Sequence, residues 1–263
     1  MILDPINSIT SIEFYKKVVG QKLGRTFLYL SYLGLMFSVA FTFFLRKQIW
    51  PVFQETFQWL ETSVPPIAFA NGRLSTPTNE KVVIRYPHNE LLAFTLDTSR
   101  TEPVTSRMLQ DDKVSGYVTA NALYVLQPGG RLDVQDFSRT PTRSAPMVVD
   151  AKLYRRLADS IHMVLYPIGL CSCFFVFLCW KLLTTVFFSL IALLINGMVE
   201  AGLGYRPLFN LSAYAQTLVI AMQTILLLVP AQVPYFGLIT TIITTVYLWL
   251  AIKRNAPPLP QGL

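Results

Sequence analysis

The chain has 263 residues, of which 52% are hydrophobic and only 14% are charged, whereas soluble domains carry about 25% charged residues. Its net charge is +7, which basic residues beside membrane spans explain better than nucleic-acid binding does. No RNA- or DNA-reading module is recognisable. The composition therefore predicts an integral membrane protein that has the lipid bilayer as a partner and binds no nucleic acid.

Residues 1–26 are expected to form an amphipathic segment at the membrane interface. From Ser8 to Val19, apolar residues recur at spacings of three and four beside Lys16 and Lys17, the pattern of an interfacial helix. Residues 27–45 carry no charge and, at about 1.5 Å per residue, can cross a hydrocarbon core of about 30 Å. We expect them to form the first span, retained as an anchor.

Residues 46–66 predict a second amphipathic helix, with Pro51 near its start and Pro65-Pro66 at its end. Residues 67–149 then predict a β-rich domain, because β-branched and aromatic residues occur in short runs separated by turn residues. Four runs are expected to form a small antiparallel sheet of about four to six strands: Lys81–Tyr86, Leu91–Leu96, Gly116–Leu126 and Arg131–Phe137.

Residues 150–254 predict a C-terminal membrane domain with spans at residues 161–180, 211–229 and 236–252. Pro167 and Gly169 are expected to bend the first of these spans, and Lys181 is expected to reach a membrane boundary. Residues 182–196 form either an interfacial continuation or a short extra span. Residues 255–263 are expected to be a flexible tail. The fold class is thus an α-helical membrane protein with four spans, possibly five, and an inserted, mainly β domain.

Basic residues near the span ends predict the orientation. With the N-terminus inside and four spans, eight of them are cytoplasmic: Lys16, Lys17, Lys22, Arg25, Lys181, Arg206, Lys253 and Arg254. Five lie on the opposite side: Arg46, Lys47, Lys152, Arg155 and Arg156. This bias favours cytoplasmic termini and an extracytoplasmic β domain, although a fifth span would place the C-terminus outside.

Several short segments also occur in a characteristic order: Ile12–Lys17, Leu23–Arg25, Ile67–Ser75, Leu91–Thr98, Tyr205–Phe209 and Ser212–Ala215. With one span before the inserted domain and a group of spans after it, the chain resembles the bacterial membrane-protein family filed as domain of unknown function 1189. The last two segments have a fainter likeness to Yip1-type membrane proteins. The resemblance implies a bacterial multi-pass protein of the cytoplasmic membrane, and it supplies no activity or catalytic residue.

No catalytic, metal or cofactor site is predicted. His88 and His162 lack a recognisable partner motif, and Asp111-Asp112 lacks the further oxygen ligands that a cation needs. The three cysteines lie in one apolar stretch and are expected to pack within a helix: Cys171, Cys173 and Cys179.

The candidate binding residues lie in the connector before the third span: Glu200, Tyr205, Arg206 and Asn210. A local ion pair that fixes the turn explains them best, with Asn210 or Ser212 capping the next helix, and partner or lipid-headgroup binding is the alternative. Gln216 and Gln223 are candidate intramembrane polar residues. Together with nearby threonines, they are expected to form hydrogen bonds between helices.

Three functions remain open. The leading hypothesis is a non-enzymatic accessory, scaffold or regulatory subunit of a membrane complex, which presents its β domain to a membrane-protein partner or to a second copy. The alternative is a component of a small-molecule transporter or channel that uses Gln216 and Gln223. An enzyme acting on lipid is the weakest hypothesis, since no nucleophile–base or metal constellation is recognisable.

Overall fold

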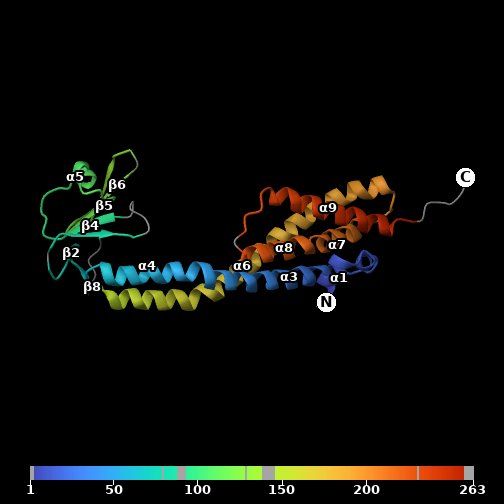
Figure 1. The fold of residues 1–263 in the computed structure, drawn as a ribbon, viewed down its shortest axis with the longest axis horizontal. Helices are drawn as coiled ribbons and strands as arrows, with labels where there is room; N and C mark the ends of the chain where they lie inside the picture. The colour runs from blue at the N-terminus through green and yellow to red at the C-terminus, as the bar shows by residue number, and fades with distance from the viewer. Residues whose placement is uncertain are drawn as a thin grey trace, which may run out of the picture. The chain divides into compact units, whose positions relative to one another are not determined.

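The computed structural model describes residues 3–78, 80–87, 93–127, 129–137, 146–229 and 231–257. The chain forms two compact units (Figure 1). The helical unit combines Met1–Ile49 with Val164–Leu263, and the β unit is Trp50–Met163. His88, the start of the predicted strand at Leu91 and the part of the predicted tail beyond residue 257 lie outside the described residues.

Four helical stretches are long and apolar enough to cross a membrane: Leu23–Ser63, Ala151–Val199, Tyr205–Leu228 and Phe236–Asn255. The helices are α1 (Asp4–Thr10), α2 (Phe14–Val19), α3 (Leu23–Phe44), the π-helical η1 (Leu45–Ile49), α4 (Trp50–Ser63), α5 (Ser106–Asp111), α6 (Ala151–Val199), α7 (Tyr205–Ala215), α8 (Thr217–Leu228) and α9 (Phe236–Asn255). Among the described residues, 182–196 belong to α6 and form no separate fifth span.

The N-terminal segment differs from the single interfacial helix that we predicted. The chain leaves helical geometry at Ser11, so α1 and α2 are separate helices. Tyr15 and Val18 are fully buried and join the core of the helical unit. The apolar face of α2 therefore packs on protein, where its contacts are side chains of α7 and α9.

The first predicted span and the following predicted amphipathic helix are one helical stretch, Leu23–Ser63. The stretch passes from α3 through η1 into α4. Pro51 has no N–H to give to the carbonyl of Lys47, and its ring crowds that carbonyl. A wider π turn directly before a proline accommodates this defect without ending the helix.

Helix α6 runs through Pro167 without ending, and the predicted bend at Pro167 and Gly169 stays a prediction. At Gly169, α6 lies close to η1. A Cβ atom added at Gly169 would lie 2.6 Å from Cδ1 of Leu45, and Leu45 is itself buried. A larger side chain at this position would therefore require the end of the Leu45 side chain to move.

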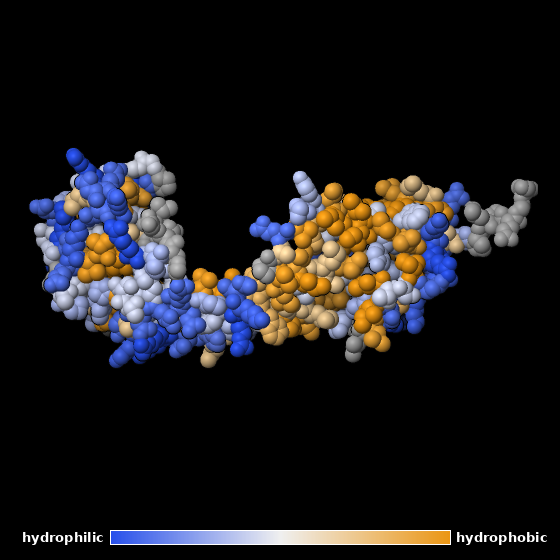
Figure 2. Space-filling view, in the orientation of Figure 1, coloured by the Kyte–Doolittle hydropathy of each residue, from blue (hydrophilic) through white to orange (hydrophobic). Residues whose placement is uncertain are grey.

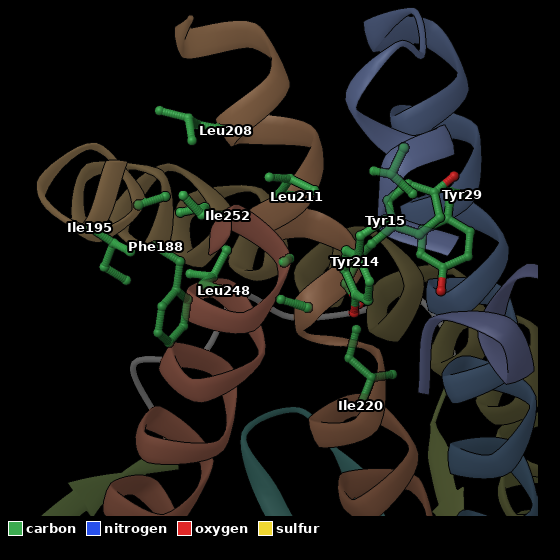
Figure 3. Packing of buried hydrophobic residues seen from close by; sticks show 14 of the residues in the cluster. Tyr15, Tyr29, Phe188, Ile195, Leu208, Leu211, Tyr214, Ile220, Leu248 and Ile252 are labelled. Carbon is green, nitrogen blue, oxygen red and sulfur yellow. The ribbon is translucent and has the colours of Figure 1, made fainter. Parts of the chain in front are cut away.

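The core of the helical unit brings together α2, α3, the second half of α6, α7, α8 and α9 (Figure 3). The rings of Tyr29 and Tyr214 stack with their centroids 3.9 Å apart. Leu208 and Leu211 of α7 and Leu248 of α9 are completely buried in the same cluster. Much of the outer surface of the unit remains apolar (Figure 2), as expected of helices that face lipid.

The β unit contains two sheets rather than one. A three-stranded sheet has the order β2-β1-β8, and a five-stranded sheet has the order β3-β4-β5-β6-β7. The strands are β1 (Ile67–Ala70), β2 (Arg73–Ser75), β3 (Val82–Arg85), β4 (Ala93–Asp97), β5 (Gly116–Thr119), β6 (Ala122–Leu126), β7 (Leu132–Asp136) and β8 (Met147–Val149).

The prediction of a purely antiparallel sheet is wrong at one place, because β4 and β5 are parallel. A parallel pair needs a crossover of about a dozen residues or more, and α5 lies in this connection. Leu109 of α5 is fully buried against Ala93 and Tyr117. The run Gly116–Leu126, which the sequence analysis assigned to the sheet, forms a hairpin of β5 and β6.

Asn71-Gly72 forms the two-residue turn between β1 and β2, with φ of 53° and 73°. Both residues need a left-handed backbone in the tight hairpin turns that suit twisted strands. This dipeptide is a strong hairpin signal, and it joins two strands that our sequence analysis did not predict.

Candidate functional site

Lys181 is the charged residue that the fold places most unexpectedly. Its side chain lies within the helical unit with only 3% exposed, so the prediction that it reaches a membrane boundary is wrong. Its Nζ donates a hydrogen bond of 2.8 Å to Oε1 of Gln223 and lies 5.3 Å from the centre of the Phe177 ring. An amide oxygen and an aromatic face thus satisfy the ammonium group inside the protein.

Gln216 lies at a break in the third candidate span. Helix α7 ends before it and α8 begins after it, and its backbone N–H bonds to the carbonyl of Tyr214. Its side-chain Nε2 donates 3.1 Å to the carbonyl of Ser212, the acceptor that a continuous helix would give to its backbone N–H. The side chain therefore supplies a donor that the break in the backbone removes.

The same amide of Gln216 links α6 to this break. Nε2 also donates 2.9 Å to Oγ1 of Thr185, and Thr184 donates 2.8 Å to Oε1 of Gln216. The Thr185 hydroxyl donates 2.6 Å to the backbone carbonyl of Lys181, and the single hydrogen of the Thr184 hydroxyl is shared between Gln216 and that carbonyl, 3.1 Å away. One turn of α6 therefore faces Gln216 and Gln223, and we call Lys181, Thr184, Thr185, Gln216 and Gln223 the Lys181 site.

The structure thus brings the two glutamines singled out from sequence to one site. Lys181 and its threonines were missed as their partners, because they lie more than thirty positions away in the chain. Four threonines of α9 were expected to form hydrogen bonds between helices, but the bonds that they donate stay within α9. Their hydroxyls donate to carbonyls of the same helix at distances of 2.8–3.0 Å: Thr240, Thr241, Thr244 and Thr245.

The four connector residues do not form the local ion pair that we expected. Glu200 is exposed with a φ of 54°, and Arg206 donates 3.3 Å to the backbone carbonyl of Gln21. Tyr205 accepts a hydrogen bond of 3.0 Å from Ser189. Because α7 already begins at Tyr205, Asn210 lies within the helix and caps nothing.

Asn210 is instead completely buried and joins the N-terminal segment to α7. Thr26 donates 2.6 Å to its Oδ1, and its Nδ2 donates 2.9 Å to the carbonyl of Gln21. Nearby, Tyr214 donates 2.9 Å to Oε1 of Gln21. These contacts fix the start of α3 against α7, which gives Asn210 a structural role.

The β unit has its own polar cluster around Asp97, which is 8% exposed. Burial alone would raise the pKa of this carboxyl, but hydrogen bonds from Ser99 and Tyr117 outweigh it and lower the pKa below the usual 3.8. Lys81 bonds to Asp112 at 2.7 Å, and this contact raises the lysine pKa. The carboxylate of Asp112 is therefore engaged by a lysine within the protein.

The other residues considered for metal binding or catalysis form no cluster among the described residues. Among the described residues, no group of three or more His, Cys, Asp or Glu side chains is placed to hold a metal ion. His162 packs edge-on against Trp50 at 4.5 Å between ring centres, and the three cysteines are unbridged. The Lys181 site can donate hydrogen bonds to an anionic or polar group, since it combines an ammonium with amide and hydroxyl groups.

A family model described as "Protein of unknown function (DUF1189)" matches residues 6–252. No curated protein and no solved structure matches the chain. The fainter likeness to Yip1-type proteins stays a prediction.

The contact between Lys181 and Gln223 should be measurable as a coupling free energy. In a double-mutant cycle of Lys181→Met and Gln223→Leu, we expect the free energies of unfolding to depart from additivity by about 0.5–2 kcal/mol, the range of hydrogen bonds between membrane helices. Titration of the full chain in mixed micelles with a denaturing detergent, followed by near-UV circular dichroism, gives these values.

The control cycle pairs Lys181→Met with Thr240→Ala, because the Thr240 hydroxyl bonds to its own helix at Gly237. Its effects should add within about 0.3–0.5 kcal/mol. Equal additivity in both cycles would contradict an energetic link between Lys181 and Gln223.

The Asp97 cluster predicts acid sensitivity of the β unit. A carboxyl whose pKa is lower in the folded state stabilises the fold above its unfolded pKa, and this stabilisation is lost as the pH falls through the folded pKa. The urea midpoint of the full chain should therefore fall below about pH 4. Asp97→Asn should make the urea midpoint fall less steeply with pH, whereas substitution of the exposed Asp111 by Asn should not. The same pH dependence of the midpoint in both variants would contradict Asp97 as the source of the acid sensitivity.

Proposed function

We propose that this chain, which belongs to the DUF1189 family, is a non-enzymatic accessory, scaffold or regulatory subunit of a complex in the bacterial cytoplasmic membrane. The family assigns no activity, so the proposal depends on physical features of the chain. The four long apolar helices support membrane insertion. A separate β unit, large enough to have its own buried cluster, supports recognition of another protein.

The orientation that we propose has both termini in the cytoplasm and the β unit outside it. The burial of Lys181 removes this residue from the eight basic residues counted on the cytoplasmic side, which leaves seven against five. The excess of basic residues still supports the same orientation.

The observation that carries the proposal is the outer edge of β8. This strand pairs with β1 on one side, and the described part of the chain places no strand on its other side. Its residues Met147, Val148 and Val149 are uncharged, and Val148 is 50% exposed. Exposed apolar edge strands are templates for pairing with another chain unless charges or coverage protect them.

The opposite edge of the same sheet is different. There the N–H of Leu74 in β2 bonds to the carbonyl of Ala120 at 2.7 Å, so part of the β5–β6 hairpin covers this edge. Ala68 of β1 is the register partner of both Val148 and Ser75. The two flanking positions therefore form a matched pair, in which Val148 is the proposed contact with a partner strand and Ser75 is its control.

A cysteine-directed crosslinker tests the contact and the orientation together. In a chain whose native cysteines are replaced by serine, Val148→Cys should react in intact spheroplasts with a membrane-impermeant maleimide–benzophenone. On illumination it should give one reproducible crosslinked band, identified by mass spectrometry. Ser75→Cys should be labelled but should give no such band.

The outcomes separate the two parts of the proposal. Failure of both cysteines to react in spheroplasts, with reaction after lysis, would overturn the orientation. Labelling of both without a crosslinked band from Val148→Cys would overturn the subunit role, while a crosslink to the same protein would identify a homo-oligomer.

A second candidate function, a component of a small-molecule transporter or channel, is favoured by the Lys181 site. Intramembrane ionisable residues usually mark substrate or ion pathways, and spans that are interrupted near the middle often form transporter binding sites. The combination of buried Lys181 with the break at Gln216 has both features. A cationic site without a carboxylate among its five residues favours an anion as the substrate.

Chloride efflux from proteoliposomes tests this second candidate. If the site conducts anions, Lys181→Met should slow the efflux about tenfold, which corresponds to the loss of a hydrogen bond to a charged group. Thr240→Ala should leave the rate unchanged. Efflux no faster than from protein-free vesicles, or equal rates in both variants, would exclude chloride conduction through this site.

A further inference from the structure

The helical unit carries a groove that the functions proposed above do not use. It lies between the end of α6 and the second half of α9. Its volume of about 400 Å³ is within the range of about 300–1,000 Å³ typical of small-molecule sites. Five of its six lining residues are apolar: Ile195, Met198, Val199, Thr245, Val246 and Trp249. Met198 is 85% exposed, so the groove opens on the outer surface of the unit.

The end of the groove carries positive charge. Lys253 lies one helical turn beyond Trp249 on α9, and its Nζ is 5.0 Å from the centre of the Trp249 ring. No ion pair between described residues includes Lys253. The ammonium therefore lies over a wall of the groove without a carboxylate partner in this part of the chain.

The neighbouring acidic residue does not neutralise Lys253. Glu13 directly precedes α2, a helix that packs against α9, and it pairs instead with Lys16 and Arg254. Glu200 directly follows Val199, which lines the groove, and is the acidic residue nearest to the groove in sequence. Its charge has to be controlled for in any test of Lys253.

We propose that this groove binds one acyl chain of an anionic phospholipid, with Lys253 as the contact for the phosphate group. On helices that face the bilayer, an apolar groove is in contact with the acyl chains of the lipids. An acyl chain is therefore the ligand that we expect to fill it. Tryptophan and lysine at a span end are the side chains that meet headgroups. A cation at this depth adds a preference for negatively charged lipids.

The inference rests on the proposed membrane insertion but not on the subunit role. It also agrees with the proposed orientation, in which the end of α9 faces the cytoplasm, since the cytoplasmic leaflet is the one that carries anionic lipids. A single unpaired lysine near the surface should favour phosphatidylglycerol over phosphatidylcholine on the order of fivefold.

Quenching of Trp249 by brominated lipids tests the proposal in the full chain. Trp50, Trp59 and Trp180 are replaced by phenylalanine, and the protein is reconstituted in phosphatidylcholine with a small, equal fraction of either brominated phosphatidylglycerol or brominated phosphatidylcholine. Quenching of Trp249 should show that brominated phosphatidylglycerol binds about fivefold more tightly than brominated phosphatidylcholine. Lys253→Gln should remove this preference, whereas Lys253→Arg and Glu200→Gln should keep it.

A chain with Trp180 as its sole tryptophan is the matched control, because this residue is exposed on α6 outside the groove. Both brominated lipids should quench it equally, as bulk lipid does. Equal quenching of Trp249 by the two lipids would overturn the headgroup contact. Quenching of Trp180 without any quenching of Trp249 would mean that protein covers the groove, and this too would overturn the proposal. Absence of quenching at both positions would contradict membrane insertion itself.

Discussion

The need to satisfy polar groups inside an apolar helical unit shapes this fold more than any other constraint. A buried donor or acceptor without a partner costs several kcal/mol in a membrane-like environment. Helix α6 brings Lys181 and two threonines into the unit, and the helices opposite supply Gln223 and Gln216 as partners. The break between α7 and α8 is tolerated because a side-chain amide replaces the missing backbone donor.

The same constraint accounts for the position of the N-terminal helices. Asn210 is completely buried in α7, and its amide is satisfied by Thr26 and by the backbone at Gln21. Tyr29 shares a hydrogen bond of 2.7 Å with Thr217 and stacks on Tyr214. These contacts fix the start of α3 against α7 and α8. Helix α2 packs beside them on α7 and α9, so an amphipathic pattern that suits a membrane surface serves tertiary packing instead.

The sequence predicted those features whose signal is local. Uninterrupted apolar runs revealed the helices that can span a membrane, and short runs rich in β-branched and aromatic residues revealed β3, β4 and β7. It did not reveal the burial of Lys181, since its acceptor Gln223 lies 42 positions away. Nor did it reveal that β4 and β5 are parallel, because the short helix α5 between them has too little periodicity to be recognised.

Chemical modification of the lysines tests whether the Lys181 side chain is buried within the helical unit. Native membranes that contain the full chain are treated with a water-soluble amine-reactive ester, and the extent of modification at each lysine is measured by mass spectrometry. We expect the exposed Lys253 and Lys22 to react readily, whereas Lys181 should stay protected until the protein is unfolded. Modification of Lys181 at the same rate as Lys253 would show that its side chain reaches water, and would contradict a buried site at this position.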